Sequence, residues 1–189
     1  MGALREKIPE LILEAAMVVF AVVVALGVDE WRENRQNAEL ANRALAGIAA
    51  EIESNRKELA ENEVANQALL ARVQEAASDS VLPDSLGINF EYSLISSSAW
   101  ETAQVTRATQ FIPLERVQTL AKVYGLQTLF QASQDKVMDF ILSVGEIADR
   151  EPERIPHLIL GPLGSAVGMG GLLVQVYDTT LARLGDGGR

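Results

Sequence analysis

The chain has 189 residues, of which 48% are hydrophobic and only 5% aromatic, and its formal net charge is −10 at pH 7. The absence of cysteine excludes disulfides, thiolate metal sites and a cysteine nucleophile, and the single histidine, His157, leaves too little imidazole for a histidine-rich metal site or for haem ligation. An acidic chain is repelled by phosphate backbones, which argues against a nucleic-acid partner. Ala, Leu and Val carry most of the apolar content, and this balance favours an all-α fold.

The first predicted element is an apolar helix over residues 8–28, preceded by a short N-terminal segment over residues 1–7. A helix of this length spans about 31 Å, close to the hydrocarbon thickness of a bilayer. The Val, Leu and Phe residues from Val18 to Val28 together favour insertion by about 2–5 kcal/mol. The run is apolar on all sides, whereas a core helix of a soluble protein is usually amphipathic. We therefore predict a transmembrane helix, with a soluble core helix and a signal peptide as the alternatives.

The two flanks of this helix predict its orientation and its polar contacts. Arg5 and Lys7 precede it, while Asp29 follows it, so the positive-inside rule places the N-terminus in the cytoplasm. Trp31 falls where an indole anchors a helix at the membrane interface. Glu14 lies inside the apolar run, which predicts an intramembrane polar contact with a neighbouring span; a carboxyl that is protonated or reaches the boundary is the alternative.

The helix is predicted to continue to about residue 77, because there is no proline between Val28 and Pro83. Apolar and amide residues recur there at alternating spacings of four and three, which is a heptad seam. Three of the seam positions are Asn55, Asn62 and Asn66, a residue type that fixes register and partner in coiled coils. Two interpretations stay open: the seam is covered by later helices of the same chain, or it is closed by another chain.

Shorter helices are predicted after a break at residues 78–84. We expect one over residues 94–110 with N-cap options at Ser96 to Ser98, one that opens at Ile112-Pro113, an apolar stretch over 130–148, and a final helix over 171–184. The glycine-rich stretch GPLGSAVGMGG at 161–171 lacks the Lys of a phosphate loop, so close helix packing or a loop is expected there. A half-embedded apolar segment over 155–174 is a further alternative. Residues 29–189 are thus expected to form a helical extramembrane domain.

Several of these motifs resemble a family of uncharacterised bacterial single-span membrane proteins. The signature is Glu14, the aliphatic span, Ala25-Leu26 and Trp31 before an Arg/Gln-rich helix, and the likeness continues at Glu51-Ile52, Asn55, Ser98-Ala99-Trp100-Glu101 and the helix that carries Tyr124. Asp29-Glu30 stands where amides are commoner in that family. The resemblance implies a bacterial single-span membrane protein with no established activity. Together with the orientation predicted by the positive-inside rule, it leads us to expect a protein of the bacterial inner membrane with a periplasmic body.

No catalytic, cofactor or metal-binding residues are predicted. The carboxylates, including Glu51, Glu58, Glu61 and Glu63, are expected on solvated helix faces, and Ser96 to Ser98 have no nearby histidine to activate them. The sequence therefore favours a non-enzymatic, membrane-anchored accessory or scaffold subunit of a larger membrane complex, such as a respiratory or photosynthetic one. Its expected partners are other membrane subunits and the lipid bilayer. The alternatives are a self-assembling coiled-coil membrane protein, hence a homo-oligomer, and an extracytoplasmic domain with an apolar ligand cavity near Trp100 and Phe140.

Overall fold

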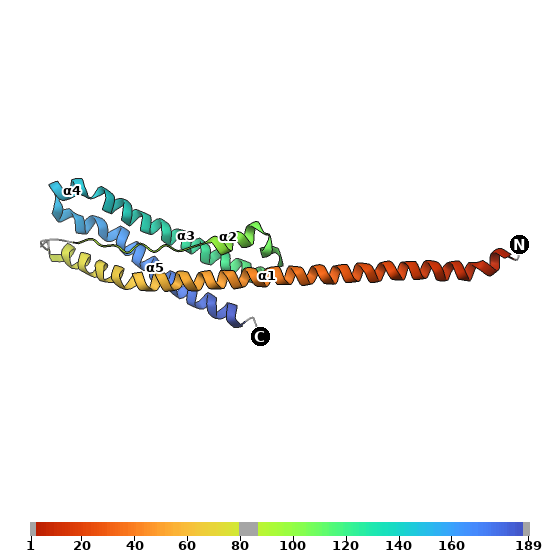
Figure 1. Ribbon diagram of the computed structural model, residues 1–189. Helices are drawn as coiled ribbons and strands as arrows, with labels where there is room; N and C mark the ends of the chain where they lie inside the picture. The colour runs from red at the N-terminus through yellow and green to blue at the C-terminus, as the bar shows by residue number, and fades with distance from the viewer. Residues whose placement is uncertain (1–2, 80–86, 187–189) are drawn as a thin grey trace. The chain divides into compact units, whose positions relative to one another are not determined.

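The computed structural model describes the backbone of residues 3–79 and 87–186, and the side chains of 16–78, 87–145 and 147–185. Its elements are α1 (Ala3–Asp79), α2 (Ser98–Val105), the short 3-10 helix η1 (Ala108–Phe111), α3 (Leu114–Ser143), α4 (Gly145–Arg150), the 3-10 helix η2 (Pro152–Arg154) and α5 (Ile155–Asp186) (Figure 1). These described residues are helical with no strand, so the predicted all-α class is confirmed. The chain divides into two compact units, residues 1–43 and 44–189.

The first unit consists of the N-terminal half of α1. The predicted span at residues 8–28 is helical throughout, and its side chains from Met17 to Val28 are exposed, with Phe20 70% and Val23 60% accessible. Trp31 is also exposed, and the Arg35 guanidinium lies 5.7 Å from the centre of its indole ring. The side chain of Glu14 lies outside the described residues.

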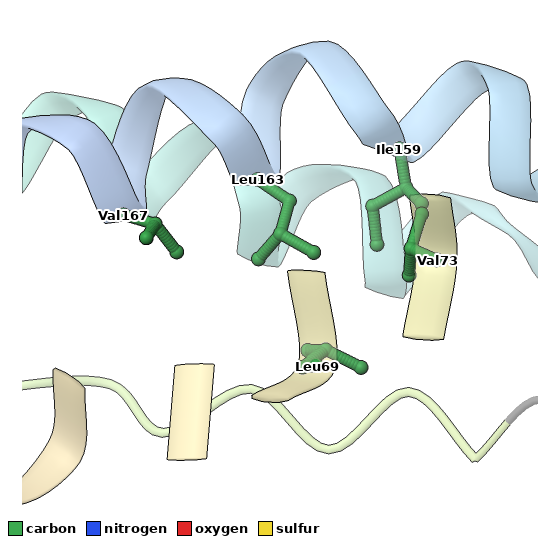
Figure 2. Packing of buried hydrophobic residues seen from close by; sticks show 5 residues of the cluster. All are labelled: Leu69, Val73, Ile159, Leu163 and Val167. Atoms are coloured by element: carbon green, nitrogen blue, oxygen red, sulfur yellow. The ribbon is translucent and has the colours of Figure 1, made fainter. Parts of the chain in front are cut away.

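The second unit is built by the C-terminal half of α1 together with α3 and α5. Its core includes a cluster in which Leu69 and Val73 of α1 pack against three residues of α5, namely Ile159, Leu163 and Val167 (Figure 2). Each fully buried aliphatic side chain of this kind stabilises the fold by about 1.5–3 kcal/mol relative to an exposed one. The predicted seam of α1 is the face that enters this core, since Ile48, Ile52, Leu59, Leu69 and Val73 are at most 1% exposed.

The predicted helix over residues 94–110 is wrong in its first turn. Residues 87–97 are extended and run beside α1 before α2 begins at Ser98, and α2 and η1 then occupy most of the remaining range (Figure 1). Arg107, in the left-handed region at φ 59°, separates the two short helices. The chain reverses there and enters α3, for which Pro113 is the N-cap residue.

The predicted start of the last helix at residue 171 is also wrong. The helix α5 begins at Ile155 and includes the whole glycine-rich stretch, with Pro162 inside it. Its apolar side chains explain why glycines do not break it, because Ile159, Leu163, Ala166 and Leu173 are buried against the rest of the unit. In a packed helix this burial outweighs the intrinsic cost of glycine, which is about 1 kcal/mol per residue.

Within the described part of the chain, one helical stretch, Pro152–Gly185, is long and apolar enough to cross a membrane, and 28% of its apolar window is buried. This length and composition are compatible with a single-pass membrane protein.

Candidate functional site: a polar ladder between α1 and α3

The extended segment of residues 87–97 lies between α1 and α3, and polar side chains from both helices bind its backbone and its serine hydroxyls. We call this arrangement the polar ladder. Its members on α1 are Glu51, Asn55, Glu58, Asn62 and Asn66, and its members on α3 are Gln127, Gln131 and Gln134. An extended segment outside a β-sheet leaves its backbone groups without strand neighbours, and these side chains take the place of those neighbours.

Three amide side chains of the ladder each pair with both backbone groups of one residue. Asn66 accepts from the Glu91 N–H and donates to its carbonyl oxygen, both at 2.9 Å. Asn55 pairs with Ser96 in the same way at 2.9 and 2.7 Å. From the opposite side, Gln134 pairs with Ser93 at 2.7 and 3.2 Å. Each amide therefore imitates the backbone of an adjacent strand.

The register of the ladder follows from the geometry of a helix and an extended chain. Asn66 holds Glu91 and Asn55 holds Ser96, so the segment runs antiparallel to α1. Between these two asparagines, α1 rises by about 16 Å at 1.5 Å per residue. Five residues of extended chain cover the same about 16 Å at 3.3 Å per residue. The two elements therefore stay in step, and the seam spacing of four and three keeps the amides on one face.

Gln127 connects the ladder to α5. This side chain is 1% exposed, and its amide nitrogen donates to the Ser96 carbonyl oxygen at 2.8 Å. Its amide oxygen accepts from the Tyr177 hydroxyl at 2.8 Å and from the Asn55 amide at 3.4 Å. All buried side-chain nitrogens and oxygens in the described residues have a partner, as a buried polar network requires.

Glu51 ends the ladder where α2 begins. Its carboxylate accepts four hydrogen bonds, from the Ser96 and Ser98 hydroxyls, each at 2.9 Å, from the Ala99 N–H at 2.8 Å and from the Tyr124 hydroxyl at 2.7 Å. Burial acts to raise the pKa of Glu51, but the four donors outweigh it and the pKa is lowered. Burial raises the pKa of Tyr124 well above its ordinary value, and the hydrogen bond to the Glu51 carboxylate and the charge of that group raise it further. A fixed negative charge thus caps the first turn of α2.

The residues that carried the family resemblance in the second unit meet at this end of the ladder. Glu51 holds Ser98 and Ala99, while the Trp100 and Tyr124 rings stack with their centres 5.4 Å apart and their planes 6° from parallel. They form a junction that fixes α1, α2 and α3 to one another. Such stacking contributes about 0.5–1.5 kcal/mol beyond burial.

The predicted seam residues have the following places. Asn55 and Asn66 are buried and Asn62 is half-buried, and their amides bind the chain's own segment, with Asn62 donating to the Ser93 hydroxyl at 3.1 Å. Glu51, Glu58 and the three glutamines of the ladder were not predicted as site residues. The glutamine spacing 127, 131, 134 repeats the four-and-three pattern of the seam on α1, and this signal was available in the sequence.

The expected solvation of Glu63 is wrong, since this side chain is 8% exposed. Trp100 and Phe140 also do not share a cavity. Trp100 stacks on Tyr124, whereas Phe140 packs at the edge of the Leu69 and Val73 cluster. Along α3, Tyr124 and Phe140 are separated by about 24 Å.

The chemistry of the ladder is that of structural recognition. Its polar groups are amides, hydroxyls and the half-buried carboxylates of Glu51 and Glu58, and no group of three or more His, Cys, Asp or Glu residues within the described ranges is arranged to hold a metal ion. Comparisons of the chain with protein-family models, with curated proteins and with solved structures gave no match.

Proposed function

We propose that this protein is a single-span membrane protein that serves as a non-enzymatic accessory or scaffold subunit of a larger membrane complex. The observation that carries the proposal is the exposed apolar surface of α1 between Met17 and Val28, where nine large hydrophobic side chains are 48–70% accessible. Exposed apolar surface of this extent marks a site of membrane or protein contact. Because it surrounds the helix, a bilayer is the environment that covers all of it.

In this proposal, residues 8–28 cross the membrane and α5 is a core helix of the extramembrane domain. Two features support this assignment of α5. Its face with Ile159, Leu163, Leu173 and Tyr177 is fully buried in the second unit. In addition, Arg56 of α1 pairs with Asp178 near its end, an exposed ion pair that suits water better than hydrocarbon.

The accessory role is supported by the way polar groups are used. Every buried side-chain donor and acceptor within the described residues has a hydrogen-bond partner, as a structural polar network requires. The Asn55 and Asn66 amides, which would have fixed the register between copies of a coiled coil, are bound within the chain. This disfavours self-assembly through the seam.

The test is affinity purification of the full chain from its native membrane in a mild detergent, followed by mass spectrometry. We expect a defined set of membrane subunits in stoichiometric amount. A matched variant with Val22→Arg and Val23→Arg should lose these partners together with the membrane, because each Arg at the centre of a span costs about 2.5–3.5 kcal/mol. Elution of the wild-type chain alone, as a multiple of its 20.5 kDa mass, would contradict the accessory role.

A further inference from the structure

Glu63 lies where α1 crosses α5, and its carboxylate packs directly on the backbone of the glycine-rich stretch. A Cβ atom at Gly170 would lie 2.5 Å from Glu63 Oε2 and 3.3 Å from Cε2 of Phe130, and one at Gly171 would lie 3.9 Å from Glu63 Oε1. Any side chain at position 170 would therefore displace the carboxylate or the Phe130 ring. The glycine allows the two helices to approach, and Phe130 of α3 closes the same contact.

The carboxylate has little polar compensation for this burial. Its one hydrogen bond within the described residues comes from the Gln67 amide, at 3.1 Å to Oε1. None of the ion pairs found within the described residues includes Glu63. They join Glu39 with Arg43, Arg56 with Glu53 and Asp178, and Glu151 with Arg154. A buried carboxylate with one neutral donor is costly while it is charged. Burial accordingly raises the pKa of Glu63, and the Gln67 bond lowers it only in part.

Only burial and the Gln67 hydrogen bond shift the pKa of Glu63, with no contribution from a neighbouring charge. Gly170 and Gly171 of α5 lie against the carboxylate, and Phe130 of α3 lies beside the Cβ position of Gly170. The next ionisable groups along these helices have other partners. On α5, the Tyr177 hydroxyl donates to Gln127 and Asp178 pairs with Arg56; on α3, Asp135 accepts from the Tyr92 hydroxyl. On α1, Glu61 is exposed. The protonation of Glu63 therefore depends on how closely α1 and α5 pack, because this packing buries its carboxylate.

We propose that Glu63 is a proton-sensitive contact between α1 and α5, which tightens when the carboxylate takes up a proton and loosens when it loses it. As a neutral acid, the side chain fills the space over Gly170 without the cost of a buried charge. As a carboxylate, it keeps its charge in a site that is 8% exposed and has one neutral donor, and it gains hydration when α5 moves away from α1. The extramembrane domain thus has a built-in response to the pH of its compartment.

Amide hydrogen exchange on the full chain in detergent micelles tests this directly, with each protection factor corrected for the intrinsic pH dependence of exchange. We expect protection of α5 residues 168–174 to rise as the pH falls from 8, and to reach about tenfold for each unit by which the pKa is raised once the pH is below the ordinary value of 4.5. In Glu63→Gln, which keeps the shape without the charge, protection should be high across this pH range. Glu61→Gln, the exposed control on the same turn, should behave as the wild type.

The proposal fails if Glu63→Gln keeps the pH dependence of the wild type, or if wild-type protection at residues 168–174 is independent of pH. Should Glu63→Gln fold poorly, the wild-type chain with ¹³C-labelled glutamate still gives a result. A Glu63 carboxyl resonance that titrates at or below the ordinary value of 4.5 would overturn the proposal. These measurements concern the domain alone, so they stand whether or not a partner complex is found.

Discussion

At the scale of single residues, the surroundings of a carboxylate on α1 decide whether its pKa is lowered or raised. Glu51 and Glu63 are both glutamates on α1, and the pKa of one is lowered while that of the other is raised. Four donors surround the first, and a glycine backbone with one amide surrounds the second. The two carboxylates therefore contribute to stability with opposite dependence on pH.

Replacement of Glu51 should weaken the junction of α1, α2 and α3. Glu51→Gln loses the charge that four donors share, and we expect the free energy of unfolding at pH 7 to fall by about 1–3 kcal/mol. The folded state holds the pKa of Glu51 below 4.5, so its contribution is present above that value and is lost as the pH falls through the lowered pKa. The difference between wild type and variant in denaturant unfolding should thus shrink below pH 4.5.

The control for Glu51 is Glu53→Gln, because Glu53 is exposed and its ion pair with Arg56 is long at 3.9 Å. Such a pair contributes about 0–1 kcal/mol. Equal losses in the two variants would show that the four hydrogen bonds of Glu51 add nothing to stability.

At the scale of elements, the close approach of α1 and α5 depends on one glycine among several. A Cβ atom at Gly170 would require the Glu63 carboxylate to shift and the Phe130 ring to give way, whereas at Gly168, on the same helix, no atom of another element lies within 4 Å of that position. Gly168→Ala should stabilise the helix by up to about 1 kcal/mol. Gly170→Ala should destabilise the protein by about 1–2 kcal/mol, since overpacking exceeds the gain in helix propensity. The thermal unfolding midpoints of the two variants test this difference. Equal midpoints would contradict tight packing at Gly170.

Replacing an asparagine of the seam distinguishes a ladder within one chain from a coiled coil between two chains. Asn66→Leu leaves both backbone groups of Glu91 without their partner, so stability should fall by about 1–3 kcal/mol while the mass of the detergent-solubilised protein stays constant. Gln74→Leu changes an exposed amide on the same helix and should have little effect. A changed oligomeric mass with unchanged stability in Asn66→Leu would instead indicate a seam between chains.

Sequence periodicity predicted the helices and the buried face of α1 because these depend on local spacing. It failed where a distant element supplies the stability. Residues 87–97 are extended because amides from α1 and α3 bind them, and no local pattern contains that information. The α5 glycines looked like an interruption, since the carboxylate and aromatic ring that pack on Gly170 lie 107 and 40 residues away along the chain. Glu63 looked solvated for the same reason.

At the scale of the whole molecule, the two units have different surfaces. Residues 17–28 present apolar side chains to their surroundings, while the unit of residues 44–189 has a buried apolar core beside its polar ladder. The net charge of −10 lies almost entirely after residue 28, which favours a body in water that is repelled by anionic headgroups. The predicted Trp31 anchor and the predicted Glu14 contact both depend on residues 8–28 being the span.

The central claim, that residues 8–28 cross the bilayer while α5 does not, is tested most directly by labelling introduced cysteines in intact cells. The chain has no cysteine of its own, so single variants at Gly2, Ala38 and Ser165 report without background; Ala38 and Ser165 are both exposed. A membrane-impermeant maleimide should label Ala38→Cys and Ser165→Cys from outside the cytoplasmic membrane, and Gly2→Cys only after the membrane is permeabilised. Labelling of Gly2→Cys in intact cells, or protection of Ser165→Cys before and after permeabilisation, would contradict this account.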